Sequence, residues 1–332
     1  MEKSGARETG DVVVHGRPEG DANSQEGAGS VSITPEHISV SGVVAPDGIN
    51  GEYVAVPEDA VPMLRRSAGT AGLAHVEEMS RSEHLAAVRA GDIGSLHSWE
   101  LVTAVDGPGT RMTTFLAGCP LRCLYCHNPD TLRMRDGEAV HVDELLRRVR
   151  RYVPVFRATG GGLTVSGGEP LMQPAFLTRL LEGAKEMGVH TAIDTSGYLG
   201  RYASDRLLSA LDLVLLDVKS GLPETYERTT GRELQPTLDF GRRLADLDKE
   251  IWVRFVLVPG LTDAEENVDA VADYVATLGS VSRVEVLPFH QMGRDKWQRL
   301  GMEYQLGDTE PPSLELTDRV RDQFRSRGLT TF

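Results

Sequence analysis

The sequence predicts an α/β protein in which parallel β-strands alternate with helices that cover the sheet. Two observations lead to this fold class. From Ile93 onward, short apolar runs rich in β-branched residues alternate with amphipathic segments of helical length. Polar and metal-binding residue types follow directly after most of the apolar runs, where parallel α/β folds build their sites. The composition differs before this region, so we divide the chain into an extension at 1–91 and a folded domain at 92–332.

Six apolar runs predict the strands of this sheet, and six amphipathic segments predict its helices. The strands are expected at 113–116, 163–165, 191–193, 213–216, 251–258 and 284–287. The helices are expected at 142–155, 174–187, 203–211, 237–248, 264–278 and 313–326. This order of strand and helix implies right-handed crossovers between neighbouring parallel strands.

The extension is expected to be disordered or weakly ordered. Residues 1–90 contain no Phe or Trp and a single Tyr, Tyr53, so they offer little large apolar surface to bury against the loss of chain entropy. Two local patterns compete with full disorder. Recurring Val, Ile and Tyr favour a small docking element at 33–56, and a helical pattern favours a short amphipathic segment at 74–88.

Charge and composition exclude several classes of protein. The 332 residues carry a formal net charge of −14, from 35 Lys and Arg against 49 Asp and Glu. Such a balance argues against broad, non-specific binding to nucleic acid or to anionic lipid. No apolar stretch approaches the roughly 20 residues that span a bilayer, and residues 1–30 lack the apolar segment of a secretory signal. We therefore expect a cytoplasmic protein that contacts neither membrane nor nucleic acid.

The chain has three cysteines, and all lie in one short segment. Cys119, Cys123 and Cys126 have the spacing C-x3-C-x2-C. An odd, clustered set of this kind indicates metal chemistry, because a disulfide framework needs pairs spread over the fold. Three thiolates leave one coordination position open, on zinc or on one iron of a cubane. A structural zinc site closed by His127 is the alternative.

Residues that could bind a metal or a ligand fall at the carboxyl ends of five predicted strands. They are Cys119 after the first strand, Gly167, Gly168 and Glu169 after the second, Asp194 and Thr195 after the third, Asp217 and Lys219 after the fourth, and His290 after the sixth. The carboxyl ends of parallel strands meet at one edge of a sheet, so we expect these residues to share one site.

Several motifs together resemble a known family. They are VDGPG at 105–109, RCLYCHN at 122–128, GGG at 160–162, SGGEP at 166–170, LDVK at 216–219 and LPFH at 287–290, with KW at 296–297. The cysteine spacing, with Tyr125 before the last cysteine, resembles the radical S-adenosylmethionine (SAM) superfamily. The whole set resembles its glycyl-radical activating enzymes, and most narrowly the pyruvate formate-lyase activating enzymes. The resemblance begins at Ile93 and leaves the extension unexplained.

This resemblance implies a fold, two cofactors and a protein substrate. The expected fold is a partial (βα)6 TIM-like barrel, with a 4Fe-4S cluster on Cys119, Cys123 and Cys126 as the catalytic centre. SAM is expected to chelate the open iron and to be cleaved reductively to a 5′-deoxyadenosyl radical. That radical would abstract a hydrogen atom from a glycine of the partner enzyme. A flavodoxin- or ferredoxin-type protein is the expected electron donor, and the activase is expected to be a monomer.

The cysteine count bears on which enzyme is activated. Activases of several other glycyl-radical enzymes carry an inserted segment with extra cysteines, which this chain lacks. Pyruvate formate-lyase is therefore the expected target, and another glycyl-radical enzyme is the alternative. A non-enzymatic metal-binding regulatory protein is the alternative from a different class.

The resemblance also assigns residues to SAM. The turn with Gly167, Gly168 and Glu169 is expected to meet the ammonium, with an ordinary turn before a helix as the alternative. Lys219 is expected to bind the carboxylate of SAM. Val218 is assigned to the site because it belongs to the same LDVK motif. Further residues complete the expected set: Tyr125, Cys126 and His127 on the adenine side, Asp194 and Asp217 on the ribose and ammonium, and His290 on the ribose or carboxylate.

Four further assignments follow. Asp194, Thr195 and Asp217 are expected to hold a monovalent cation, or else to cap neighbouring helices. Arg254 lies in an apolar strand and needs an anion, for which SAM or Asp217 would serve. Asp106 and Gly107 are expected to recognise the partner enzyme, with a plain β-turn as the alternative. The segment 291–304 is expected to cover the open side of the barrel or to pack there as an amphipathic element.

Overall fold

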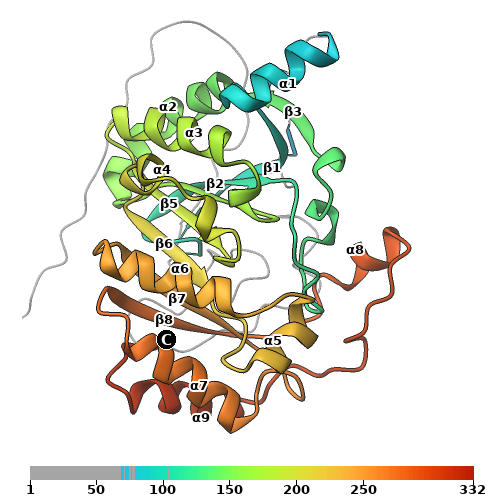
Figure 1. Cartoon of the computed structure of the whole chain (residues 1–332), viewed down its shortest axis with the longest axis vertical. Coiled ribbons are helices and arrows are strands. Elements are labelled where there is room, and N and C mark those ends of the chain that lie inside the picture. Colours follow the sequence, from blue (N-terminus) through green and yellow to red (C-terminus); the bar gives the residue numbers. More distant parts are fainter. Residues whose placement is uncertain (1–68, 71, 75, 77–78, 104) are drawn as a thin grey trace, which may run out of the picture. The chain divides into compact units, whose positions relative to one another are not determined.

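A computed structural model describes residues 69–332, apart from residues 71, 75, 77, 78 and 104 (Figure 1). The docking element expected at 33–56 lies outside the described residues. Within the described part, no helix is both long enough and apolar enough to cross a membrane.

One eight-stranded sheet forms the centre of the fold, in the order β3-β1-β2-β4-β5-β6-β7-β8. The strands are β1 (Ile93–Thr103), β2 (Thr110–Leu116), β3 (Glu138–His141), β4 (Gly162–Gly167), β5 (His190–Thr195), β6 (Leu213–Asp217), β7 (Glu250–Leu257) and β8 (Val281–Pro288). Six of these strands are parallel and pair in the order β2, β4, β5, β6, β7, β8. They coincide with the six predicted strands, which confirms an α/β fold with a parallel sheet of the partial-barrel kind.

Two strands were not predicted. β1 pairs antiparallel with both β2 and β3, so β1 and the edge strand β3 extend the sheet beyond β2. The hairpin turn between β1 and β2 contains Asp106. Glycine, serine and histidine interrupt the apolar pattern of β1, which explains why periodicity did not reveal it.

Helices follow the strands in the expected alternation. They are α1 (Arg81–Ala90), α2 (Val142–Thr159), α3 (Pro174–Glu186), α4 (Asp205–Ser209), α5 (Pro223–Thr230), α6 (Gln235–Asp246), α7 (Glu265–Ala276), α8 (Arg294–Arg299) and α9 (Leu314–Arg325). The six predicted helices correspond to α2, α3, α4, α6, α7 and α9. The short helices α5 and α8 were not predicted.

The two faces of the sheet have different neighbours. On β6, Val214 and Leu216 belong to the main core together with residues of the covering helices. The alternate residues Leu213 and Leu215 form a small cluster with Ala192 and Trp252 inside the sheet's curve. The polar side chains of the site lie further along this inner face, at the carboxyl ends of the strands.

A helix forms within the segment expected to be an extension. Ser80 accepts a hydrogen bond from the Glu83 amide, and the Glu83 carboxylate accepts one from the Ser80 amide, which is a capping box at the start of α1. Gly91 ends the helix with a φ of 77°. These local signals account for order at 81–90, although the domain boundary at residue 91 remains a prediction.

Candidate active site

The three cysteines follow β2 in a loop that packs into one apolar cluster. Cys123 is buried, and Cys119 and Cys126 are half-buried. The cluster consists of Leu121, Cys123, Tyr125, Val258, Leu261, Phe289 and Leu306, with Cys119 and Cys126 against it. Burial raises the pKa of all three thiols. The pKa of Cys126 rises to about 12, chiefly through burial and in part through the nearby Cys123.

This donor set fits an iron–sulfur cluster. A bound metal supplies the positive charge that favours the thiolate form of such buried thiols. No three His, Cys, Asp or Glu side chains in the described ranges lie together as ligands of a single ion. A cubane does not need such convergence, because its thiolates bind different irons. Three thiolates would hold such a cluster and leave its fourth iron for another ligand.

The glycine turn after β4 lies against the cysteine loop. The Gly168 and Glu169 amides donate hydrogen bonds of 2.8 Å to the carbonyls of Leu116 and Gly118. Gly167 has a φ of +118°, and a Cβ atom there would lie 2.3 Å from the Leu116 amide nitrogen. Only glycine fits this close approach, so the turn and the start of the cysteine loop are fixed to each other.

The Glu169 carboxylate has a different role from the one expected. One oxygen accepts hydrogen bonds from the Leu171 amide (3.1 Å) and the Thr195 hydroxyl (2.7 Å). The other accepts from the amide (3.0 Å) and hydroxyl (2.6 Å) of Ser196. Four donors therefore surround a side chain that is 1% exposed. Glu169 therefore joins the loops after β4 and β5.

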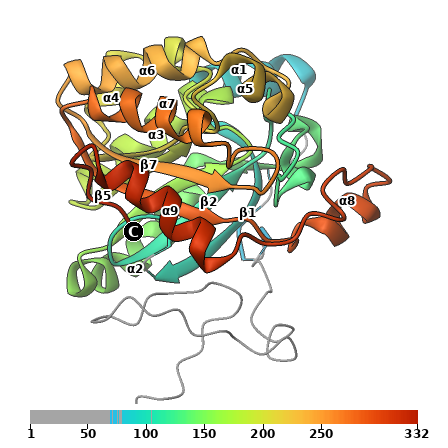
Figure 2. The same cartoon turned by 90° about the horizontal axis from the view of Figure 1, so that it is seen from below.

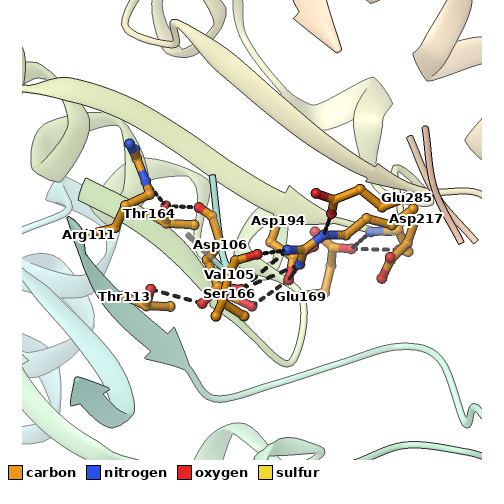
Figure 3. A network of polar contacts seen from close by, with 12 residues as sticks. Val105, Asp106, Arg111, Thr113, Thr164, Ser166, Glu169, Asp194, Asp217 and Glu285 are labelled. Atoms are coloured by element: carbon orange, nitrogen blue, oxygen red, sulfur yellow. Dashed lines mark hydrogen bonds and ion pairs between the residues drawn. The ribbon is translucent and has the colours of Figure 1, made fainter. Parts of the chain in front are cut away.

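Arg254 forms ion pairs with three carboxylates. Figure 3 shows this network of charges, with Asp106, Asp194 and Glu285 labelled. The Arg254 guanidinium is 3.1 Å from Glu285, 3.4 Å from Asp194 and 3.5 Å from Asp106, and it donates to the Val105 carbonyl. SAM and Asp217 are the anions expected for Arg254. Its direct ion pairs are with three other carboxylates, although the negative charge of Asp217 also contributes to raising its pKa. A contact with SAM stays a prediction.

Asp194 combines a charged partner with an unused acceptor. Its Oδ2 accepts a 2.8 Å hydrogen bond from Ser166, while its buried Oδ1 has no hydrogen-bond partner among the described residues. Burial raises the pKa of Asp194 to about 7, and this effect outweighs the opposing influence of Arg254. The free oxygen is an acceptor that a ligand ammonium or hydroxyl would satisfy.

Asp217 and Lys219 pair with each other at the end of β6. The Lys219 ammonium lies 2.8 Å from the Asp217 carboxylate and 5.6 Å from the centre of the Tyr125 ring. Lys219 also influences the pKa of Cys123, so its charge acts on the cysteine loop. Val218 points into the main core, and its amide bonds to the Arg254 carbonyl, so its side chain is not part of the site.

Two histidines that are far apart in the sequence are in contact. The rings of His127 and His290 stack with centroids 4.2 Å apart and planes at 29°. His127 Nε2 also lies 3.2 Å from the His290 carbonyl oxygen. His127 and His290, which were expected to contact the adenine and the ribose or carboxylate of SAM, therefore lie side by side, and His127 directly follows Cys126 in the chain.

The expected cation ligands do not all face one way. The Thr195 hydroxyl donates to Glu169, whereas Asp194 points to the opposite face of β5, toward Arg254. Asp194 and Asp217 already have Arg254 and Lys219 as positive neighbours. A cation at this place would need main-chain oxygens, and Thr195 would not contribute its side chain.

The turn at 105–109 folds into the barrel side of the sheet. Asp106 is 9% exposed, and its Oδ2 accepts a 2.9 Å hydrogen bond from Thr113. Arg111 is fully buried and donates to the carbonyls of Pro108 (3.2 Å) and Leu163 (2.7 Å) and to Thr164 (2.6 Å). The Asp106 carboxylate therefore faces the charge network, and its expected role in partner recognition requires contact from inside the site.

Sequence reasoning missed some residues of this site. They are Glu285 in the charge network, Ser196 as a partner of Glu169, and Arg111, Thr113 and Thr164 around the hairpin turn. Thr195 was expected in the site as a cation ligand, and its contact with Glu169 was not predicted. A signal for Glu285 existed. Arg283 and Glu285 alternate with apolar residues in β8, which places charged side chains on one face of a strand.

Six parallel strands with covering helices, and three cysteines at C-x3-C-x2-C beside a glycine turn, define the radical SAM class of enzymes. Residues 113–271 match the Radical SAM superfamily. A radical SAM methyltransferase from Sphaerobacter thermophilus has a similar fold, with a TM-score of 0.51 at 15% identity over 76% of this chain and 81% of that chain.

Two relatives narrow the class further. Pyruvate formate-lyase 1-activating enzyme of Escherichia coli is 39% identical over 238 residues, which cover 71% of this chain and 97% of the relative. Pyruvate formate-lyase-activating enzyme of Staphylococcus epidermidis is 44% identical over 70% of this chain and 94% of the relative. The chain belongs to the family of pyruvate formate-lyase-activating enzymes.

Proposed function

We propose that this protein activates pyruvate formate-lyase by generating a glycyl radical on it. The observation that carries the proposal is the position of the cysteine loop, which is hydrogen-bonded to the glycine turn after β4 and whose Tyr125 ring lies 5.6 Å from the Lys219 ammonium at the end of β6. Membership of the activating-enzyme family supports the same conclusion.

In the proposal, Cys119, Cys123 and Cys126 hold a 4Fe-4S cluster whose open iron binds SAM. When bound, these groups supply a 5′-deoxyadenosyl radical by reductive cleavage of the sulfonium. The protein holds the cofactor and keeps water away from the reacting atoms. The apolar cluster around Cys123 keeps water away, because its members are buried.

The protein groups around SAM have complementary charge. Main-chain carbonyls of the turn at 167–169 and the free Oδ1 of Asp194 accept from the ammonium or from hydroxyls. The Lys219 ammonium is proposed to bind the SAM carboxylate, which its charge and its position beside Asp217 and Tyr125 support. His127 and His290 form a stacked pair that offers a flat surface to the adenine.

The partner glycine is proposed to approach from the side of Asp106. Its carboxylate lies in the charge network with Arg254, so a glycine loop that enters the barrel would meet it there. A flavodoxin- or ferredoxin-type protein is the proposed electron donor, by analogy with the family.

The test is direct. The purified chain is reconstituted anaerobically with iron and sulfide, then mixed with pyruvate formate-lyase, SAM and a reductant. Electron paramagnetic resonance (EPR) should detect a glycyl radical on the lyase, and formate production should rise with it. Cys123→Ala should give neither signal. A reconstituted chain that cleaves SAM but leaves the lyase without a radical would redirect the proposal to another glycyl-radical enzyme.

A further inference from the structure

The segment 290–307, which we call the arm, contacts the cysteine loop from outside the sheet. It contains α8, which stands beyond the end of the sheet toward which β7 and β8 point (Figure 2). Within the arm, Trp297 is 7% exposed, and its ring packs against Tyr304 with centroids 5.8 Å apart. A buried indole in an otherwise projecting segment indicates a specific contact.

The contact is with the third cysteine. Trp297 Nε1 donates a 2.8 Å hydrogen bond to the main-chain carbonyl of Cys126. Gly293 approaches the same carbonyl so closely that a Cβ atom there would lie 2.9 Å from it and 3.0 Å from the His127 Cα. The arm therefore fixes the direction of the peptide that follows Cys126.

A second contact holds the residues after the cysteine. Lys296 Nζ donates a 2.8 Å hydrogen bond to Asn128 Oδ1 and forms a 3.2 Å ion pair with Asp130. Asp130 in turn lies 3.1 Å from His97 Nε2, which belongs to β1. The loop from Cys126 to Asp130 is thus held between the arm on one side and the edge of the sheet on the other.

We propose that Trp297 and Lys296 are positioning residues that fix the Cys126 main chain and so determine how firmly the cluster is retained. This inference rests on the proposed function, because it requires the cluster at the three cysteines. Partners that orient a metal ligand without touching the metal commonly change metal affinity by about 10- to 100-fold when removed. The arm supplies two such partners to one ligand segment.

The test uses the full chain reconstituted with ferrous iron and sulfide under anaerobic conditions. Trp297→Phe keeps the ring and removes the N–H donor. Its matched control is Trp252→Phe, which also removes an indole N–H donor. That donor forms a 3.1 Å hydrogen bond with Glu250 and not with the cysteine loop. Release of iron to a chelator should be about tenfold faster in Trp297→Phe. The control should release iron at the rate of the unsubstituted chain.

A second pair of variants keeps the proposal decidable if Trp297→Phe does not fold by circular dichroism. Lys296→Met should also release iron several-fold faster, whereas Lys185→Met, which breaks a comparable pair with Asp212, should not. Both arm variants should also change the EPR signal of the reduced cluster.

The outcomes separate this inference from the proposed function. If the unsubstituted chain takes up a cluster and the arm variants retain it equally well with the same EPR signal, the positioning role is wrong and the proposed function stands. If the unsubstituted chain takes up no cluster, both are wrong.

Discussion

The guanidinium of Arg254 lies 3.4 Å from the Oδ2 of Asp194, and two strands that are not neighbours supply them, β7 and β5. The same guanidinium meets Asp106 from the β1–β2 turn and Glu285 from β8. One buried cation therefore joins four separate parts of the barrel. This arrangement makes the charge network both a structural element and the wall of the proposed SAM site.

Arg254→Met should destabilise the protein strongly, because it leaves the Asp106 and Asp194 carboxylates, which are largely shielded from solvent, without their shared cation and takes one of two cations from Glu285. Removing one member of a buried ion pair typically costs about 3–5 kcal/mol. Urea unfolding of the cluster-free chain measures the loss. Adding Glu285→Gln to the Met variant should recover part of the stability, and a Met variant as stable as the unsubstituted chain would contradict the network's role.

The contribution of Asp194 to stability should fall as the pH rises from about 4 to about 7. The pKa of Asp194 is raised from 3.8 to about 7 in the folded protein, chiefly by burial, so the folded state binds more protons than the unfolded state in this interval. Burial also raises the pKa of Glu169 and adds to the same slope. Asp194→Asn should make the dependence shallower in urea unfolding at several pH values. An unchanged slope would show that Asp194 ionises as it does in the unfolded chain.

Glu169→Gln should destabilise the protein although it preserves shape. Whichever way the amide points, its NH2 group faces a main-chain amide, that of Leu171 or of Ser196. An unsatisfied buried donor costs about 1–3 kcal/mol. Glu182→Gln is the control, because Glu182 forms a partly exposed pair with Arg206 that is worth at most about 1 kcal/mol. Equal losses in the two variants would contradict the account of Glu169.

Arg111→Lys should destabilise the protein even though it keeps the charge. The fully buried guanidinium contacts carbonyl and hydroxyl oxygens on the hairpin turn and on β4, and one ammonium cannot reach all of them. The expected loss is on the order of 3 kcal/mol, from acceptors left unsatisfied. Thermal and urea unfolding measure it, and a change within about 0.5 kcal/mol, as for a surface substitution, would contradict the role.

The sequence allowed the fold and the location of the site to be predicted, because both depend on local patterns. Six apolar runs marked the parallel strands, and the residues after them marked the end at which the site forms. The antiparallel strands β1 and β3 were not predicted, because polar residues interrupt the apolar pattern of β1 and because β3 is a four-residue edge strand.

The partners of the charged residues were not predictable in the same way. Arg254 pairs with Asp106 across 148 residues, and His127 meets His290 across 163 residues. Such pairings depend on how the barrel closes, which no short motif encodes. For the same reason the sequence indicated that Glu169 belongs to the site, while its four hydrogen-bond donors emerged only from the structure.

The central claim is that three thiolates hold a cluster with one iron open to SAM. The most direct measurement is EPR of the anaerobically reconstituted, dithionite-reduced chain, recorded with and without SAM. The account predicts a reduced-cluster signal that changes when SAM is added and that disappears in Cys123→Ala. A chain that binds zinc and shows no cluster signal after the same reconstitution would contradict it.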